Sequence, residues 1–296
     1  MAIITILGIP HSYELTEGRT AAPTLVFLHG WLLSREYWQP LIERLRSRYQ
    51  CLSYDLRGFG DSWRISPDGE TEEHYPVLGY TPGDYAADLG RLLQGLELEK
   101  VWLVGHSLGG SVALWAASQF PERVEGVVCL NSGGGIYLKE EFERFRAAGT
   151  QLVKWRPQWL TEVPLLDWLF TRSQAYQPLA RKWGRQRLLD FVRASYPAAL
   201  GTLLDSTTED QVHQLPQLVS QLLQPVHFIA GAEDKVMEPR YVRHLASFHQ
   251  LFRSGCDNVV EIPECGHFSM LEASDRVARE IDRLVNGKVY DDRLAS

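Results

Sequence analysis

A single serine lies between two glycines in the stretch VWLVGHSLGGSVALWAAS, where an apolar run changes into a segment rich in small residues. The run has the composition of a buried strand, and the segment after it has that of a helix. Glycine at positions 105 and 109 lets the chain turn sharply, so the hydroxyl of Ser107 projects beside the N–H groups of a helix N-terminus. A hydroxyl in this place could act as a nucleophile if a base activates it.

Two polar residues follow later strand-like runs and could supply that base and the acid that orients it. Asp234 follows the run PVHFIAGAE, and His267 follows the run NVVEIPEC through a glycine-containing loop. In nucleophilic acyl transfer the histidine takes the serine proton, and a carboxylate stabilises the charged histidine. We therefore predict a triad of Ser107, Asp234 and His267. Spacing barely separates Asp234 from its neighbour Glu233, which stays an alternative acid.

A tetrahedral intermediate also needs two backbone N–H donors to hold its oxyanion. One is expected from Leu108, the residue after the nucleophile. The other is expected from Trp31, in the loop after the run TLVFLHG, where Gly30 allows close backbone approach. His29 lies in the same loop, and we interpret it as a brace for that loop rather than as a second catalytic histidine.

Short apolar runs that alternate with amphipathic segments must position these residues. The runs are TLVFLHG, CLSYDLRG, VWLVGHS, VEGVVCLN, PVHFIAG and NVVEI. Runs that are apolar on both faces suit the strands of a parallel sheet covered by helices on each side. The opening segments IITILGI and SYEL suit an antiparallel hairpin. The alternation predicts an α/β fold with right-handed crossovers, in which ligands bind at the carboxyl ends of the strands.

One long segment interrupts this alternation. Residues 134–224 show helical patterns, four tryptophans and no convincing strand. That length is far beyond an ordinary connection between two strands. We therefore predict a helical cap, or lid, over residues 134–224, inserted into a core made of residues 1–133 and 225–296.

Composition and charge limit the partners. The chain has 296 residues, 45% of them hydrophobic and 23% charged, with a formal net charge of −7, which argues against nucleic acid as the main partner. It shows neither a signal peptide nor an apolar run long enough to span a membrane, so we expect a cytoplasmic protein. Its cysteines lack CxxC and metal-ligand spacing, and we expect reduced thiols and neither a metal nor a cofactor. They are Cys51, Cys129, Cys256 and Cys265.

Taken together, these motifs resemble the α/β-hydrolase superfamily, and within it the serine esterases, lipases and related acyl hydrolases. The resemblance is carried by LHGW, YDLRGFGDS, GHSLGG, GAEDKVMEP and ECGHFSMLE, and GxSxG is the nucleophile elbow of that fold. It implies a doubly wound, mostly parallel sheet of eight strands with the cap inserted after the sixth. It also implies a metal-free serine hydrolase that cleaves carboxylic esters through an acyl-enzyme. We interpret YDLRGFGDS as a loop fastening rather than a phosphate loop.

Three departures argue against other branches of this superfamily. Branches with an aspartate nucleophile would carry aspartate at Ser107. The cofactor-free haloperoxidase group typically has proline where this chain has Leu32, and the menaquinone-pathway lyase usually has arginine where it has Ser111. Three alternatives stay open on the same triad. They are an acyltransferase, a hydrolase of long isoprenoid esters of the chlorophyll or pheophytin type, and a ligand receptor that retains the triad.

Within the predicted cap, the segment from Lys154 to Arg193 has eight basic and three acidic residues in an otherwise acidic chain. Aromatic and basic residues together are typical of a membrane-interfacial surface, or of a site for an apolar substrate with an anionic end. We therefore predict that Trp155, Trp159 and Trp168 bind substrate and that the cap makes peripheral membrane contact. The alternative is a packed lid with solvated arginines.

Overall fold

Eight strands of the computed structural model form one sheet, in the order β1-β2-β4-β3-β5-β6-β7-β8. The structure describes residues 1–18, 22–62, 79–133, 139–172 and 174–287, with the backbone alone for 139–142. Strands β1 (Ala2–Ile6) and β2 (Ile9–Leu15) form an antiparallel hairpin, and β2 pairs antiparallel with β4 (Cys51–Tyr54). The hairpin that the opening segments predict is thus confirmed.

The remaining strands pair in parallel, as the apolar runs predict. They are β3 (Thr24–Leu28), β5 (Val101–His106), β6 (Val124–Leu130), β7 (Val226–Gly231) and β8 (Val259–Ile262). Because β3 has β4 on one side and β5 on the other, the loops after β3 and β5 leave the same edge of the sheet as neighbours. Such a switch point is where open α/β sheets bind ligands.

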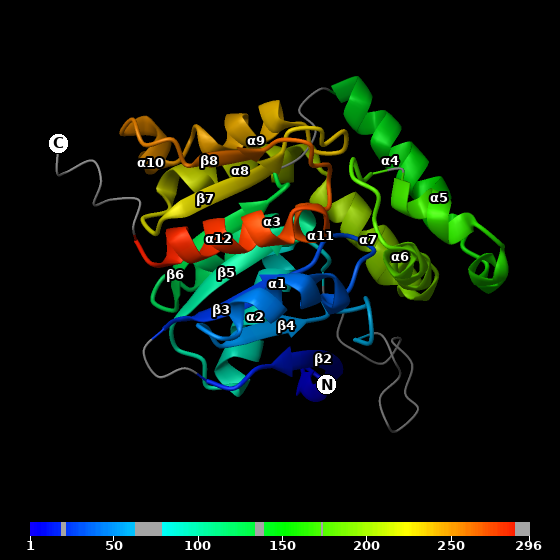
Figure 1. Ribbon diagram of the computed structural model, residues 1–296, viewed down its shortest axis with the longest axis horizontal. Helices are drawn as coiled ribbons and strands as arrows, with labels where there is room; N and C mark the ends of the chain where they lie inside the picture. The colour runs from blue at the N-terminus through cyan, green and yellow to red at the C-terminus, as the bar shows by residue number, and fades with distance from the viewer. Residues whose placement is uncertain (19–21, 63–78, 134–138, 173, 288–296) are drawn as a thin grey trace.

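Alternate residues of β3 point into two separate hydrophobic cores. Leu25 and Phe27 belong to one core, while Val26 and Leu28 belong to the other. Helices α1 (Gln39–Leu45) and α12 (Ser274–Val285) cover the first core and lie in front of the sheet in Figure 1. Helices α2 (Pro82–Gly95), α3 (Leu108–Gln119), α8 (Glu209–Gln221) and α9 (Pro239–Ala246) cover the second. Short helical turns complete the described core: η1 (Arg35–Trp38), α10 (Gln250–Arg253) and α11 (Ser269–Glu272).

The described residues between β6 and β7 form helices. They are α4 (Lys139–Lys154), η3 (Gln158–Glu162), α5 (Leu166–Arg172), α6 (Arg181–Arg193), α7 (Tyr196–Ser206) and α8. Figure 1 shows α4 to α7 grouped to one side of the sheet, and we call these residues, 139–206, the α4–α7 segment. Helix α8 instead packs against α3 and α9. The predicted boundary at residue 224 includes α8 in the cap. A helix that covers a sheet and a helix of a cap have the same hydrophobic period, so the sequence pattern could not separate the two.

Candidate active site

Ser107 occupies the sharp turn between β5 and α3. Its backbone has φ 52° and ψ −119°, a region that residues other than glycine rarely adopt. Two backbone hydrogen bonds hold this turn, from Ser107 N to Leu130 O at 2.9 Å and from Gly110 N to Ser107 O at 3.0 Å. A Cβ at Gly105 would lie 2.2 Å from Gly109 O, so strand and helix approach too closely for any side chain. The glycines around Ser107 are therefore required by the turn, as the sequence predicts.

The structure brings His267 and Asp234 together beside this turn. His267 Nδ1 donates a hydrogen bond to Asp234 Oδ2 at 2.8 Å, which leaves Nε2 without a proton in the neutral ring. The backbone N–H of His267 donates to Gln174 O at 2.9 Å and fixes the loop that carries the ring. Ser107 and His267 both line one cavity. His267 thus faces the same space as the serine, and its Nδ1 is hydrogen-bonded to Asp234.

Asp234 is a buried carboxylate that accepts four hydrogen bonds. The donors are His267 Nδ1, Asn131 Nδ2, Val236 N and Met237 N, at 2.8 to 2.9 Å. Burial raises the pKa of Asp234, but the charge of His267 and these hydrogen bonds outweigh it and hold the pKa below the ordinary value. The carboxylate is therefore ionised at neutral pH. Its neighbour Glu233 is exposed, so the structure separates the two acids that spacing could not.

Two residues that sequence reasoning did not place in the site position the Asp–His pair. Asn131, at the end of β6, donates through Nδ2 to Asp234 Oδ2 at 2.8 Å and to Gly266 O at 3.0 Å. The buried His106 ring donates through Nε2 to His267 O at 2.8 Å, and its centroid lies 4.8 Å from that of His267. Burial lowers the pKa of His106 to about 3, so the ring is neutral. Asn131 shares the signal that identifies Asp234, a polar residue at the end of a buried strand.

The two predicted oxyanion donors lie on either side of Ser107. Leu108 is the first residue of α3, so its N–H has no partner within the helix. A Cβ at Gly30 would lie 3.2 Å from Ser107 Cβ, which places the loop with Trp31 directly against Ser107. Trp31 Nε1 donates to Ala199 O at 2.9 Å, which anchors its indole to α7. Trp31 and Leu108 both line the cavity, and their role as oxyanion donors stays a prediction.

His29 uses both ring nitrogens to hold the loop that carries Trp31. Nδ1 donates to Gly30 O at 2.8 Å, and Nε2 accepts from Leu56 N at 2.9 Å. Burial lowers the pKa of His29 to about 4, so the neutral ring with this tautomer is the stable form. The predicted bracing role matches this geometry.

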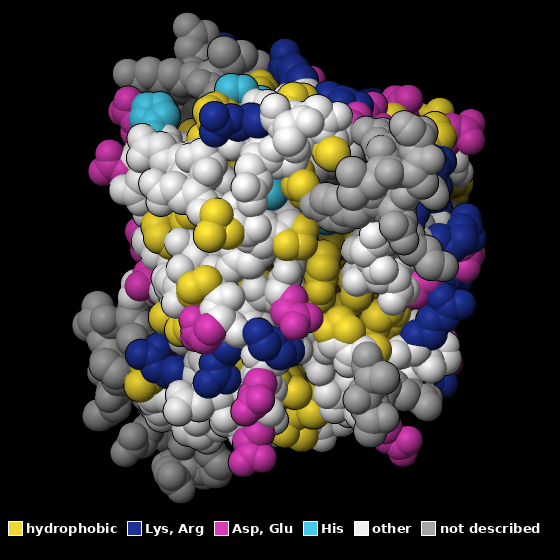
Figure 2. All heavy atoms as spheres, turned by 90° about the vertical axis from the view of Figure 1, so that its left-hand side faces the viewer, with side chains coloured by type: hydrophobic (Ala, Val, Ile, Leu, Met, Phe, Trp, Pro, Cys, Tyr) yellow, Lys and Arg dark blue, Asp and Glu magenta, His cyan; other side chains and the backbone are white. Residues whose placement is uncertain are grey.

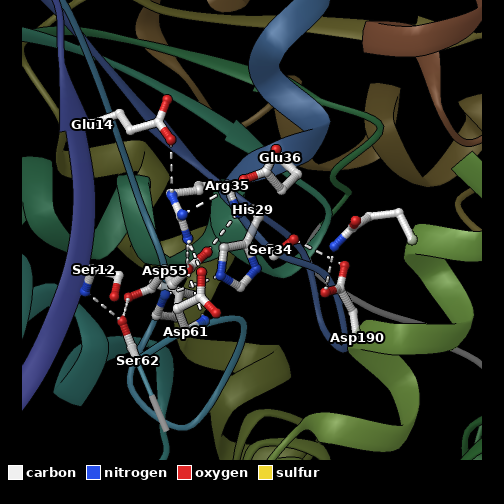
Figure 3. Close-up of polar contacts among 12 residues, drawn as sticks. Ser12, Glu14, His29, Ser34, Arg35, Glu36, Asp55, Asp61, Ser62 and Asp190 are labelled. Atoms are coloured by element: carbon white, nitrogen blue, oxygen red, sulfur yellow. Dashed lines mark hydrogen bonds and ion pairs between the residues drawn. The ribbon is translucent and has the colours of Figure 1, made fainter. Parts of the chain in front are cut away.

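The loop DLRGFGDS is fastened around a buried carboxylate, as Figure 3 shows. Asp55 accepts hydrogen bonds from Arg35 N at 2.6 Å, from Arg35 Nη1 and from Asp61 N at 2.9 Å. Ser62 Oγ donates to Asp55 O at 2.8 Å. Glu14 adds an ion pair to the outer side of Arg35 at 3.5 Å. These contacts match the predicted loop fastening, and none of these residues is among the described residues that line the cavity.

The cavity over Ser107 is small and mainly apolar. Its volume is about 230 Å³, slightly below the roughly 300–1,000 Å³ of pockets for drug-sized ligands. The α4–α7 segment supplies the wall opposite Ser107, through Phe145, Phe170, Phe191 and Leu203. This geometry suits a small substrate with an apolar body.

The tryptophans predicted to bind substrate lie on the outside of the α4–α7 segment. Trp155, Trp159 and Trp168 are 65%, 53% and 51% exposed, and none of them is among the described residues that line the cavity. Trp155 and Trp159 contact each other edge to face, with centroids 5.9 Å apart. The prediction of a tryptophan-lined substrate site is therefore corrected. Composition alone could not tell which way the indoles point.

Comparison with known proteins identifies the family to which this fold belongs. The sequence profile of the alpha/beta hydrolase fold matches residues 23–274. The chain belongs to this family. The resemblance inferred from the elbow and its companion motifs is confirmed, together with the mostly parallel eight-stranded sheet of the α/β-hydrolase fold.

This α/β-hydrolase is similar to proteins with different activities. It is 27% identical, over 273 residues, to a 2-succinyl-6-hydroxy-2,4-cyclohexadiene-1-carboxylate synthase of Serratia proteamaculans, covering 90% of this chain and 94% of the relative. A thermophilic esterase from Thermogutta terrifontis superposes with a TM-score of 0.73 at 22% identity, covering 98% of this chain and 100% of the esterase. An esterase from Exiguobacterium antarcticum gives 0.74 at 18% identity, covering 96% and 98%. The departure at Ser111 therefore does not by itself set the chain apart from such synthases.

Proposed function

We propose that this α/β-hydrolase is a serine hydrolase that cleaves small carboxylic esters through an acyl-enzyme. The observation that supports it best is the hydrogen bond between His267 Nδ1 and Asp234, facing the same cavity as Ser107. A neutral histidine held in this tautomer presents Nε2 as a base. In this proposal the hydroxyl of Ser107, at the strained elbow, gives its proton to that base.

In the proposed mechanism, Ser107 Oγ attacks the ester carbonyl while His267 Nε2 takes its proton. Asp234 stabilises the imidazolium that forms, and the N–H groups of Trp31 and Leu108 bind the oxyanion. His267 then returns the proton to the leaving alcohol. Water, activated by the same histidine, attacks the acyl-enzyme and releases the acid.

The cavity volume predicts how activity depends on chain length. For 4-nitrophenyl esters, each methylene buried in the cavity should favour binding by about 0.8 kcal/mol, or about fourfold in kcat/KM. We expect kcat/KM to rise over the first few methylenes and then to fall, because a cavity of about 230 Å³ fills early. A panel from acetate to dodecanoate, with one isoprenoid ester, measures this profile. A profile that still rises at dodecanoate would favour a hydrolase of long isoprenoid esters instead.

The same panel of esters distinguishes a hydrolase from an acyltransferase and from a receptor. Added alcohols that intercept the acyl group faster than water would indicate an acyltransferase, and a single turnover per protein would indicate a receptor.

The relative from Serratia proteamaculans raises one more candidate, because its name describes a product with a succinyl and a carboxylate group. The guanidinium of Arg187 on the cavity wall favours this second reaction. Formation of that product in the absence of ester turnover would make it the better assignment.

We also propose that the protein works in the cytoplasm and touches an anionic membrane through the outer surface of η3 and α5. No helix in the described ranges combines the length and apolar composition needed to cross a bilayer. Trp159, Leu165, Trp168 and Leu169 are nonetheless exposed large apolar residues on or next to these helices. Exposed cations lie on α4, α5 and α6, and they are Lys154, Arg172, Arg181, Lys182 and Arg185. Exposed aromatic residues together with cations are typical of a surface that inserts at lipid headgroups.

The side of the molecule away from α4 and α5 differs in charge pattern. Figure 2 shows basic and acidic side chains lying close together on that side, with hydrophobic atoms between them. A mixed surface of this kind attracts an anionic membrane less than a patch of one sign does. The charge pattern therefore favours membrane contact through the outer surface of η3 and α5.

Membrane contact predicts co-sedimentation with vesicles that contain phosphatidylserine at low salt. Binding should weaken as salt screens the arginines, and should be weaker with phosphatidylcholine alone. The double variant Trp168→Ser, Leu169→Ser should lower the bound fraction several-fold. Ile3→Ser, which changes an equally exposed apolar residue on β1, should not. Equal sedimentation of wild type and the double variant would contradict the proposed surface.

A further inference from the structure

The cavity wall carries one permanent charge among the residues that the structure describes. The described lining residues include no aspartate, glutamate or lysine, and Arg187 is their one arginine. The other polar groups on the wall, apart from the site itself, are hydroxyls and the Gln174 amide. A mainly apolar cavity with a single cation is suited to an anionic group on its ligand.

Arg187 is fixed close to the catalytic histidine. It lies on α6, and its Nη2 donates to Gln174 Oε1 at 2.7 Å while Nη1 donates to Phe170 O. The guanidinium lies over the face of Phe268, 4.7 Å from the ring centroid. Phe268 directly follows His267, and Gln174 O accepts the His267 N–H at 2.9 Å. Two residues therefore connect the guanidinium to His267: Phe268, whose ring it contacts, and Gln174, which bonds to both.

Arg187 has no carboxylate partner within the described part of the chain. Its two hydrogen bonds go to neutral oxygens and use two of five N–H groups. The nearby acid on the same helix, Asp190, is buried and accepts hydrogen bonds from Ser34 and Gln186. Burial raises the pKa of Asp190 to about 8, so at neutral pH this carboxyl is mostly protonated and offers little compensation. A partly buried cation without a counter-ion is unfavourable unless a ligand supplies the anion.

We propose that Arg187 binds a carboxylate of the substrate, so that the preferred esters carry a carboxylate on the part that faces α6. This deepens the proposed ester hydrolysis and rests on it. A guanidinium presents its donors as a planar fork that matches a carboxylate, and contact with the face of Phe268 helps to hold that fork in place. The apolar residues around it exclude water and strengthen the pair.

The test compares two esters of equal length, the monoanionic 4-nitrophenyl adipate and the uncharged 4-nitrophenyl adipamate. Because hydrogen bonds to charged groups are the stronger ones, wild type should prefer the anionic ester by about 10- to 100-fold in kcat/KM. Arg187→Met keeps an unbranched apolar stem, removes the guanidinium and its charge, and should abolish this preference, while turnover of the uncharged ester falls by several-fold at most. Arg185→Met removes an exposed arginine of the same helix and should keep the preference.

Arg187→Lys serves if the methionine variant fails to fold, since it keeps the charge and should keep part of the preference. A wild-type ratio near one, or a ratio that Arg187→Met leaves unchanged, overturns the assignment. A structural arginine would lower both rates together and leave their ratio intact.

A binding measurement separates this inference from the proposed function. The adipamate anion, the acid released from the uncharged ester, carries one carboxylate and one amide. Calorimetric titration of this anion into the Ser107→Ala protein needs no turnover. Binding that Arg187→Met weakens by about 10-fold or more supports the anion site even if no ester is cleaved. No binding to the Ser107→Ala protein overturns the site, even if neutral esters are hydrolysed.

Discussion

Replacing Ser107 with alanine should lower kcat for ester hydrolysis by up to about 10⁶-fold, as loss of the nucleophile does in subtilisin. The protein should stay folded, because backbone hydrogen bonds from Ser107 N and to Ser107 O hold the elbow and the side chain adds little packing. Steady-state kinetics with the best ester of the panel measures the loss, and thermal unfolding verifies the fold.

Ser118→Ala is the matched control, because Ser118 is an exposed serine on α3, the helix that begins directly after Ser107. It should hydrolyse esters at the wild-type rate. Turnover by the Ser107→Ala protein at a rate near wild type would show that another group performs the chemistry.

The second large effect is expected at the acid. Asp234→Asn should lower kcat by on the order of 10⁴-fold, because an amide cannot stabilise the imidazolium and favours the wrong histidine tautomer. The neighbouring carboxylate provides the control. Glu233 is exposed, and His267 Nδ1 bonds to Asp234 instead, so Glu233→Gln should change kcat several-fold at most.

The order of these two effects discriminates between the acids. If Glu233→Gln were the slower enzyme, the acid of the triad would be misassigned. If both variants kept wild-type rates, His267 would act without a carboxylate, and its hydrogen bond to Asp234 would be structural.

The sheet and the elbow could be predicted because their signals are local. Strands β3, β5 and β7 are fully buried, so their apolar runs stand out against the amphipathic helices between them. The glycines around Ser107 are required by the close approach of strand and helix, which leaves a fixed spacing in the sequence. Strand ends that share one sheet edge then bring Ser107, Asp234 and His267 together.

The choice between Asp234 and Glu233 could not be made locally. Which of two adjacent carboxyls turns inward depends on donors from elsewhere in the fold, here Asn131 directly after β6 and His267 in its loop. Asn131 also follows a buried strand, but sequence reasoning did not select it, because its partner Asp234 is over a hundred residues away in sequence.

The α4–α7 segment was the least predictable part. Its tryptophans and arginines stand out in composition, yet helical period does not fix which face meets the core. Trp168 is exposed, whereas Arg187 turns to the cavity and stacks on Phe268. The orientation of both side chains follows from how α5 and α6 pack against each other and against η3, which is a tertiary property.

Covalent labelling with a fluorophosphonate tests the central claim most directly. The reagent reacts with serines that an adjacent base activates, and it needs no knowledge of the substrate. We predict a stoichiometric adduct on the peptide that contains Ser107, with labelling lost in Ser107→Ala and strongly slowed in His267→Ala. Equal labelling of wild type and Ser107→Ala, or an adduct that maps to another serine, would contradict the assignment of Ser107 as the nucleophile.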